Sequence, residues 1–172
     1  GKFTNTLIVS PPGCGKTTIL RDIIRQVSNG IEKLGIKGKN IGLVDERGEI
    51  AAVWQGIANL DVGIRTDIIS NSPKYLGMEM LVRSMGINII ATDEIGGQKD
   101  FDAIKYANCS GVGLIFTMHG KDLNDVLKRD GMKELLDEGM FSNIILLSNK
   151  NGVGTIENIC DLDKNIVKSK VI

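Results

Sequence analysis

The sequence has 172 residues, of which 42% are apolar and 24% charged, and its 21 Lys and Arg side chains are balanced by 21 Asp and Glu side chains. This length and composition are typical of one globular domain, residues 1–172, and exclude a disordered chain, a collagen-like chain and a disulfide scaffold. The zero net charge argues against a generally basic nucleic-acid-binding protein. No apolar run reaches the about 18 residues that a transmembrane helix needs.

Five short apolar runs predict buried strands, at residues 6–9, 41–44, 87–91, 112–116 and 143–147. Because these runs are continuous rather than alternating, they are typical of a sheet that is covered on both faces. Apolar residues at helical spacing predict helices between the strands, at residues 17–28, 73–85, 98–108, 123–128 and 132–138. The alternation of strand and helix predicts an α/β fold with a mostly parallel sheet and right-handed crossovers.

Weaker signals fill the gaps between these elements. Ile68 and Ile69 predict a further short strand, and residues 30–40, rich in Gly, Lys and Asn, predict an exposed connection. The Asn-Lys-Asn-Gly sequence at residues 149–152 is a turn signal that predicts a C-terminal hairpin. Because the sequence opens at Gly1 without an initiator Met, we expect an N-terminal domain to precede it in a longer parent protein.

Several large or reactive side chains are expected to pack inside the protein. The helix at residues 73–85 is predicted to bury an apolar face made of Leu76, Met78, Met80 and Leu81. Trp54 is expected to pack rather than to stack on a base. The scattered cysteines show no zinc-ligand spacing, which favours buried thiols in a reducing cytoplasm, at Cys14, Cys109 and Cys160.

The first strand runs into a glycine-rich loop, Ser-Pro-Pro-Gly-Cys-Gly-Lys-Thr-Thr at residues 10–18, which a predicted helix follows. This nearly matches the Gly-x-x-x-x-Gly-Lys-Ser/Thr pattern of a phosphate-binding loop, with Ser10 in place of the first glycine. The glycines let backbone N–H groups turn inward around phosphates, Lys16 supplies positive charge, and the Thr17 hydroxyl can ligate Mg²⁺. The expected nucleotide-binding residues are Pro12, Gly13, Cys14, Gly15, Lys16, Thr17 and Thr18. The alternative is a glycine-rich turn that matches by chance.

Two carboxylates follow the predicted strand at residues 87–91. In a phosphate-loop fold this strand lies beside the strand of the loop, so that Asp93 can reach the Mg²⁺ shell. Glu94 can then orient or deprotonate the attacking water. The structural alternative is a solvated acidic strand end.

The strand at residues 41–44 ends in a similar way, with Asp45, Glu46 and Arg47. Because the ends of parallel strands share one edge of a sheet, Asp45 and Glu46 are rival candidates for holding metal or water. An ion pair of these carboxylates with Arg47 is equally consistent with the sequence.

Three further polar residues are candidates for contact with the γ-phosphate. His119 is the only histidine and follows the fourth strand, where sensing the γ-phosphate and simple packing are equally consistent. Arg65 and Arg83 are candidates for stabilising γ-phosphate charge across a subunit contact. Structural pairing of Arg65 with Asp67, or of Arg83 with Glu79, is the alternative.

The order of these motifs resembles the type II/IV secretion ATPase superfamily of P-loop NTPases, in which a phosphate loop, an acidic box, an acidic strand and a histidine box follow one another. The segments at residues 61–67, 72–74, 77–78 and 83–85 look more narrowly like the stage III sporulation protein AA family. The resemblance covers about residues 5–162. It implies a three-layer RecA-like or AAA+-like core with a C-terminal hairpin.

The same resemblance implies an ATPase that needs Mg²⁺. It would act in the cytoplasm of the mother cell, as a hexamer docked on membrane partners, and would power a sporulation channel to the forespore. Lys16 and Thr17 would bind phosphate and Mg²⁺, and Asp93 and Glu94 would be the metal and water residues. His119 would be the histidine-box residue and Glu46 the acidic-box candidate.

Two other functions remain open. A nucleotide-switched assembly subunit without catalytic activity would fit the departure at Ser10. A nucleic-acid motor finds support only in the seven basic and two acidic side chains of residues 1–39, an excess of five positive charges. The 4% of aromatic residues and the zero net charge weaken that reading. ATP is preferred over GTP by resemblance only.

Overall fold

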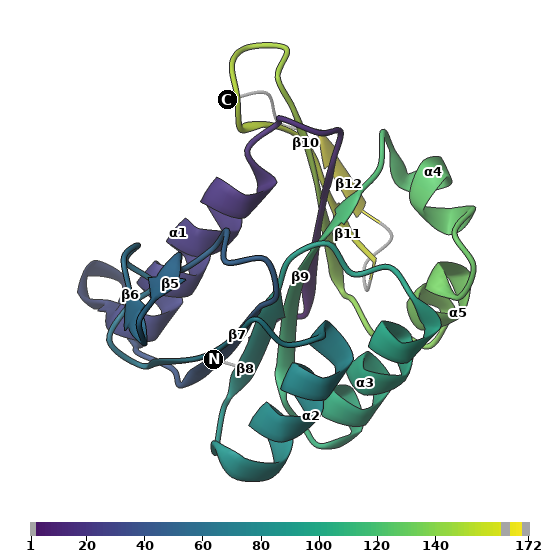
Figure 1. The fold of residues 1–172 in the computed structure, drawn as a ribbon. Coiled ribbons are helices and arrows are strands. Elements are labelled where there is room, and N and C mark those ends of the chain that lie inside the picture. Colours follow the sequence, from purple (N-terminus) through teal and green to yellow (C-terminus); the bar gives the residue numbers. More distant parts are fainter. Residues whose placement is uncertain (1–2, 163–165, 170–172) are drawn as a thin grey trace.

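The computed structural model of the protein describes residues 3–162 and 166–169. The strands of its main sheet are β1 (Thr6–Ser10), β4 (Ile41–Asp45), β7 (Thr66–Ser70), β8 (Ile89–Thr92), β9 (Gly113–His119), β10 (Asn143–Ser148), β11 (Thr155–Asp161) and β12 (Ile166–Ser169). The helices are α1 (Lys16–Asn29), α2 (Lys74–Ser84), α3 (Gln98–Cys109), α4 (Leu123–Leu127) and α5 (Met132–Asp137). The chain path is drawn in Figure 1.

The strands of this sheet lie in the order β12–β11–β10–β1–β9–β8–β4–β7. From β10 to β7 all neighbours are parallel, while β11 runs antiparallel to β10 and β12 antiparallel to β11. The predicted α/β fold, its mostly parallel sheet, the short strand at Ile68 and Ile69 and the C-terminal hairpin are therefore confirmed. Because β1 lies between β10 and β9, the loop that follows it emerges within the carboxyl edge of the parallel strands.

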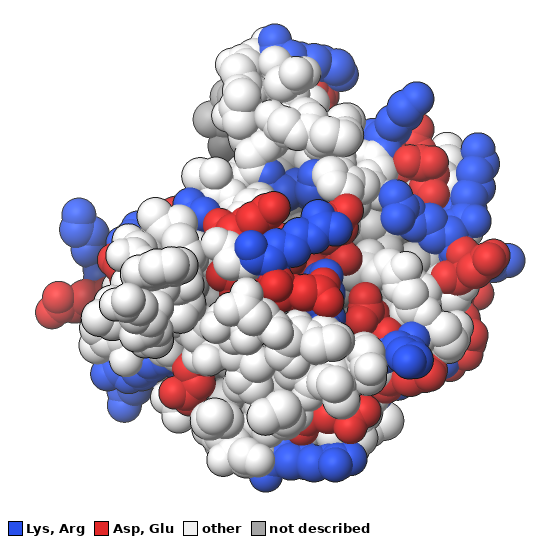
Figure 2. Space-filling view, in the orientation of Figure 1, with Lys and Arg blue, Asp and Glu red and all other residues white. Residues whose placement is uncertain are grey.

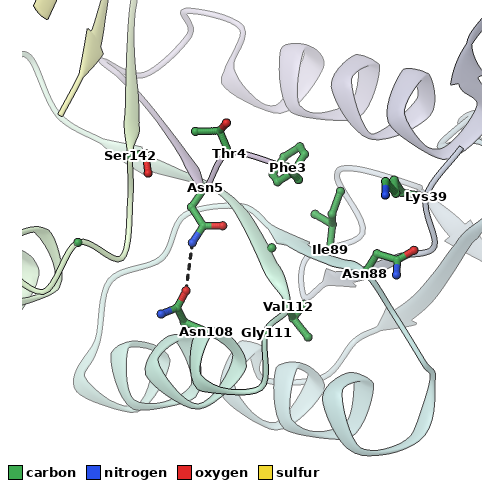
Figure 3. A pocket seen from close by; sticks show the side chains of 12 residues that line it. Phe3, Thr4, Asn5, Lys39, Asn88, Ile89, Asn108, Gly111, Val112 and Ser142 are labelled. Atoms are coloured by element: carbon green, nitrogen blue, oxygen red, sulfur yellow. Dashed lines mark hydrogen bonds between the residues drawn. The ribbon is translucent and has the colours of Figure 1, made fainter. Parts of the chain in front are cut away.

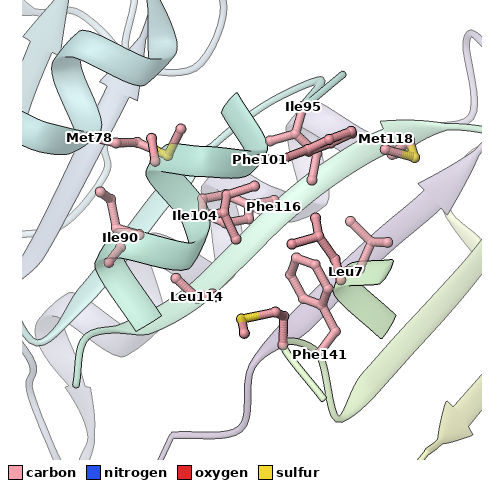
Figure 4. Close-up of a cluster of buried hydrophobic side chains, with 14 of the residues drawn as sticks. Leu7, Met78, Ile90, Ile95, Phe101, Ile104, Leu114, Phe116, Met118 and Phe141 are labelled. Atoms are coloured by element: carbon pink, nitrogen blue, oxygen red, sulfur yellow. The ribbon is translucent and has the colours of Figure 1, made fainter. Parts of the chain in front are cut away.

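Helices cover both faces of the sheet, which gives the molecule three layers (Figure 1). On one face, Leu20 and Ile24 of α1 pack into an apolar cluster with Ile8 of β1. On the other face, α2, α3 and α5 enclose a second cluster that includes Met78, Phe101, Ile104, Leu114, Phe116, Leu135 and Phe141 (Figure 4). The rings of Phe116 and Phe141 meet edge to face, with centroids 6.1 Å apart. This double burial explains why the strand sequences are continuously apolar.

Helix α2 buries only part of the apolar face that its spacing predicts. Met78 and Leu81 are fully buried as predicted, but Leu76 is 42% exposed and Met80 55% exposed, so the prediction was wrong for these two side chains. The cause is Gly77, where an added Cβ would lie 2.6 Å from Cγ1 of Val44. The absence of a side chain at Gly77 lets α2 approach β4 closely, and this contact sets the rotation of the helix.

Two small hairpins lie outside the main sheet. Strands β2 (Gly30–Ile31) and β3 (Ile36–Lys37) pair around the 3₁₀-helix η1 (Glu32–Leu34), so the predicted exposed connection contains short regular structure. Strands β5 (Val53–Trp54) and β6 (Ile57–Ala58) form the second hairpin. It is too short to enclose an indole, and Trp54 is 71% exposed, so the prediction that it packs inside was wrong.

The cysteine prediction is confirmed for Cys14 and Cys160, which are buried, and wrong for Cys109, which is exposed at the end of α3. All three are free thiols. Among the described residues, no helix has the length and apolar content needed to cross a membrane.

Candidate functional site

The glycine-rich loop connects β1 to α1 through two residues in the left-handed region. Gly13 has φ 73° and Gly15 has φ 83°, a conformation that side chains other than glycine rarely adopt. Ser10 ends β1 without a positive φ, and its hydroxyl donates to the carbonyl of Pro11 at 2.7 Å. The serine therefore fits with ordinary backbone angles. Because α1 begins directly after Gly15, the unpaired N–H groups of its first turn face the loop.

Lys16 lies under this loop, with only 8% of its surface exposed. Its Nζ is 3.3 Å from Oγ of Ser10, 3.3 Å from the carbonyl oxygen of Pro11 and 3.0 Å from Nδ1 of His119. Burial lowers the pKa of Lys16, while nearby Cys14, Glu94 and Asp93 act in the opposite direction. None of these close partners is a carboxylate, so the ammonium group is held by neutral acceptors.

His119 connects Lys16 to the acidic strand end. Its Nδ1 faces Nζ of Lys16, and its Nε2 lies 3.3 Å from Oε1 of Glu94. Because an ammonium group can only donate, Nδ1 accepts from Lys16, and the other ring nitrogen, Nε2, faces the Glu94 carboxylate. The parallel pairing of Ser10 with His119 in β1 and β9 brings the histidine beside the loop.

Asp93 and Glu94 follow β8 and differ in their surroundings. Asp93 is 4% exposed, and its Oδ1 has no hydrogen-bond partner among the described residues. Burial raises the pKa of Asp93, and the nearby charge of Lys74 opposes this shift. Glu94 has φ 44°, in the left-handed region, and its N–H donates to Oγ1 of Thr117 at 3.0 Å. This bond fixes the backbone from which the Glu94 carboxylate projects.

These groups line one pocket of about 420 Å³ at the carboxyl edge of the sheet. Its lining residues are Pro12, Gly13, Gly15, Lys16, Thr17, Thr18, Arg47, Glu49, Asp93, Glu94, Thr117, His119 and Val153. Figure 2 shows acidic and basic side chains close together in the hollow near the centre of this face. The structure thus brings together most of the residues that the sequence singled out. Cys14 supports the loop from inside, because its carbonyl accepts from the N–H of Gly154 at 3.1 Å.

The two carboxylates at the end of β4 are engaged elsewhere. Asp45 accepts backbone N–H groups of Glu49 at 3.0 Å and Ala51 at 2.8 Å, which ties down the loop after the strand. Glu46 pairs with the buried ammonium group of Lys74 and does not line the pocket. The structure therefore does not bring Asp45 or Glu46 to the site, in contrast to the sequence-based expectation. The reason is that other donors bind both carboxylates: N–H groups of the following loop bind Asp45, and Lys74 of α2 binds Glu46.

The arginine candidates also lie outside the pocket of this chain. Arg65 donates to the carbonyl of Ser28 at 3.2 Å, rather than pairing with Asp67. Arg83 pairs with Glu79 at 3.5 Å, as the structural alternative predicted, and lies 5.7 Å from the centre of the Tyr106 ring.

Four lining residues were not proposed as site residues from the sequence. They are Arg47, Glu49, Thr117 and Val153. Thr117 lies two residues before His119 on β9 and so shares its side of the strand, which was a usable signal. Val153 belongs to the turn of the C-terminal hairpin, and an added Cβ at Gly15 would lie 3.0 Å from its Cγ1. No local pattern indicates that this turn reaches the loop.

The arrangement of sheet, layers and loop defines a RecA-like α/β core, a fold that solved secretion ATPases share. The VirB11 ATPase of the Brucella suis type IV secretion system superposes with a TM-score of 0.63 at 15% identity, over 94% of this chain and 49% of that protein. The pilus retraction motor PilT superposes with a TM-score of 0.59 at 14% identity, over 85% of this chain and 42% of that protein. At these identities the likeness shows the fold.

The sequence gives the narrower assignment. The family described as sporulation stage III, protein AA, matches residues 2–167, and the chain belongs to this family. It is 40% identical over 165 residues to stage III sporulation protein AA of Bacillus subtilis, covering 96% of this chain and 53% of that protein. It is also 27% identical over 132 residues to the protein ycf45 of Cyanidium caldarium, covering 77% of this chain and 38% of that protein. The chain thus spans about half the length of its Bacillus relative and a smaller part of its Cyanidium relative.

Proposed function

We propose that this chain is the ATP-binding and ATP-hydrolysing core of a secretion-type ATPase that acts in sporulation. The observation that carries the proposal is the line of contacts from Lys16 through His119 to Glu94 within one pocket. It joins a buried cation suited to phosphate with a carboxylate suited to activating water. Hydrolysis of a nucleoside triphosphate uses both groups.

Phosphate binding is assigned to the loop and the first turn of α1. Lys16 is held only by neutral acceptors, so an anionic phosphate is a stronger partner than any of them. Gly13 and Gly15, both with positive φ, line the pocket together with Thr18. Cys14 contributes through its backbone, because its side chain is buried.

The residues at the site fit a magnesium ion. Asp93 offers a buried carboxylate oxygen without a hydrogen-bond partner in the described chain, and Thr17 lines the same pocket. No group of three or more His, Cys, Asp and Glu side chains among the described residues is placed to hold a metal ion. Thr17 and Asp93 would therefore hold Mg²⁺ together with phosphate oxygens and water, as Mg²⁺ commonly binds. When bound, the ion neutralises charge on the phosphates.

Glu94 is the proposed residue that orients or deprotonates the attacking water. His119 contacts both Lys16 and Glu94. A phosphate that draws Lys16 away from His119 therefore changes the contact of His119 with Glu94, which is its proposed sensing role. Glu46 is assigned to holding Lys74 rather than to catalysis.

The wider role rests on the family and on the fold neighbours. We propose that the full-length protein forms a hexamer and docks on membrane partners of the sporulation channel, from the cytoplasm of the mother cell. Arg65 and Arg83 are the arginines proposed to contact the nucleotide of a neighbouring subunit. Both are exposed on this chain, which leaves them accessible to a second copy.

Release of phosphate from ATP tests the enzymatic proposal. We expect the chain to release phosphate only when Mg²⁺ is present. The rate per chain should rise with protein concentration, because higher concentrations favour assembly. The Lys16→Ala variant should lose this activity. Binding of ATP with no release at any concentration would instead support a nucleotide-switched assembly subunit. A change in molecular size on nucleotide binding would then identify that alternative. The contacts of Glu94 with both His119 and Arg47 are an observation that supports it.

A further inference from the structure

Both oxygens of the Glu94 carboxylate are engaged by cationic or polar partners. Oε1 faces Nε2 of His119 at 3.3 Å, and Oε2 accepts from Nη1 of Arg47 at 2.8 Å. A carboxylate held on both oxygens has less freedom to accept a proton from water. The pair with Arg47 therefore competes with the role proposed for Glu94.

Arg47 carries an exposed side chain on a loop that is held in place. It lies two residues beyond the end of β4, in a loop that Asp45 holds through the N–H groups of Glu49, Ile50 and Ala51. The side chain is 56% exposed and that of Glu94 34% exposed, so the ion pair lies open to solvent. An exposed pair of this kind contributes little to stability, and its partners can be exchanged at low cost.

Arg47 also faces the same pocket as the phosphate loop. It is the only arginine among the described lining residues, and Lys16 is the only lysine. Glu49 and Asp93 are the other carboxylates that line this pocket. A terminal phosphate group would add negative charge between these side chains. A guanidinium group binds phosphate oxygens in a bidentate way and is well suited to exchange a carboxylate for them.

We propose that Arg47 discriminates nucleoside triphosphate from diphosphate within a single subunit. It pairs with Glu94 when the γ-phosphate is absent, and it moves to the γ-phosphate when a triphosphate binds, which releases Glu94 to act on water. This inference rests on the proposed nucleotide-binding function and deepens it. No subunit contact is required for the exchange, in contrast to the roles proposed for Arg65 and Arg83.

Equilibrium binding of two nucleotides tests this inference without requiring hydrolysis. The dissociation constants of Mg²⁺-ADP and of a Mg²⁺-bound, non-hydrolysable ATP analogue are measured for the unaltered chain, Arg47→Gln and Arg47→Lys. Arg25→Gln is the matched control, because Arg25 forms an exposed pair with Asp22 at 2.5 Å on α1, outside the pocket.

We expect Arg47→Gln to weaken binding of the ATP analogue about tenfold, the scale of one charge-assisted hydrogen bond, with no change for ADP. Arg47→Lys should recover part of the loss, and Arg25→Gln should change neither constant. An equal loss for both nucleotides, or no loss for either, would overturn the inference while leaving nucleotide binding intact. If the folded, unaltered chain bound neither nucleotide, the proposed function would fail together with it.

Discussion

The two edges of the parallel sheet each carry a cavity, and the two cavities differ in chemistry. The cavity at the amino edge is the larger, about 570 Å³ against about 420 Å³ at the carboxyl edge. Its lining includes Phe3, Asn5, Asn88 and Asn108, and Lys39 is the only charged residue among the described residues that line it (Figure 3). The smaller pocket is lined by Lys16, Arg47, Glu49, Asp93 and Glu94. Cavity size alone would therefore select the amino edge, away from the acidic side chains.

The difference lies in whether the polar groups are already satisfied. At the amino edge, Asn5 donates to Oδ1 of Asn108 at 3.1 Å and to the carbonyl of Met140 at 2.9 Å, and it accepts from the N–H of Leu114 at 2.9 Å. At the carboxyl edge, Asp93 keeps a buried oxygen without a partner in the described chain. Asparagines that bind each other hold a structure together, whereas a buried carboxylate oxygen without a hydrogen-bond donor favours a ligand.

The largest expected effect lies within the charged pocket. Glu94→Gln keeps the shape of the side chain but removes the ionised group that accepts a proton. We expect the rate of phosphate release from Mg²⁺-ATP to fall about 10²–10⁴-fold, the usual contribution of a general base. Binding of Mg²⁺-ATP, measured by titration, should persist. An unchanged rate would show that another group activates the water.

At the amino edge we expect a loss of stability instead of activity. Asn5→Ala leaves the buried N–H of Leu114 without its acceptor, which should lower the free energy of unfolding by about 1–3 kcal/mol. Chemical denaturation measures this, with the exposed Asn124→Ala on α4 as the control. Nucleotide affinity should not change in either folded variant. A specific loss of affinity in Asn5→Ala would contradict the division between the two edges.

Asp93 should show the opposite balance, with stability gained and ligand response lost. Asp93→Asn removes a buried charge and should raise the free energy of unfolding at neutral pH by about 0.5–2 kcal/mol. Unfolding of this variant should no longer respond to Mg²⁺ beyond the response to nucleotide alone. A destabilised variant would indicate that the Asp93 carboxylate has a structural partner.

The pH dependence of the stability gained in Asp93→Asn follows from the direction in which the pKa of Asp93 is shifted. Because burial raises the pKa of Asp93, the folded protein holds this proton more tightly than the unfolded chain does. The ionised form therefore costs stability as pH rises from the ordinary carboxyl value through the raised one. The advantage of Asp93→Asn should vanish at low pH, where the carboxyl group is protonated in both states. An advantage that persisted there would contradict the assignment.

The smallest expected effect belongs to Arg83, which lies outside both cavities. Its pair with Glu79 is exposed, so Arg83→Gln should change the free energy of unfolding by less than about 0.5 kcal/mol. Nucleotide binding by the isolated chain should be unaffected. A loss of phosphate release that appears only in the assembled protein would support a role across a subunit contact. Weaker nucleotide binding by the isolated Arg83→Gln chain would contradict the placement of Arg83 outside the carboxyl-edge pocket.

The contrast between the edges also separates what the sequence predicts from what it does not. Gly13, Gly15, Asp93 and His119 were predicted as site residues because local signals place them at the ends of strands that share one edge. The pairing of Arg47 with Glu94 depends on β4 lying next to β8, and chain order does not specify that neighbourhood. The deciding contact here joins two segments that are distant in sequence.

The predictions for the buried face of α2 and for the position of Glu46 were wrong for a related reason. Apolar periodicity favoured Leu76 and Met80 as core residues, but the contact of Gly77 with Val44 turned the helix. Glu46 lies at a strand end like Glu94, but Lys74 at the start of α2 binds it. Predicting either outcome requires the packing of α2 against β4, which the sequence pattern does not contain.

Binding of Mg²⁺-ATP to two matched lysine variants tests the central claim most directly. Lys16→Ala removes the lysine of the carboxyl-edge pocket, and Lys39→Ala removes the lysine of the larger amino-edge cavity. We expect one nucleotide to bind per chain, with affinity reduced about ten- to a hundredfold in Lys16→Ala and unchanged in Lys39→Ala. Unchanged affinity in Lys16→Ala, or a comparable loss in Lys39→Ala, would contradict the claim that ATP binds at the carboxyl edge of the sheet.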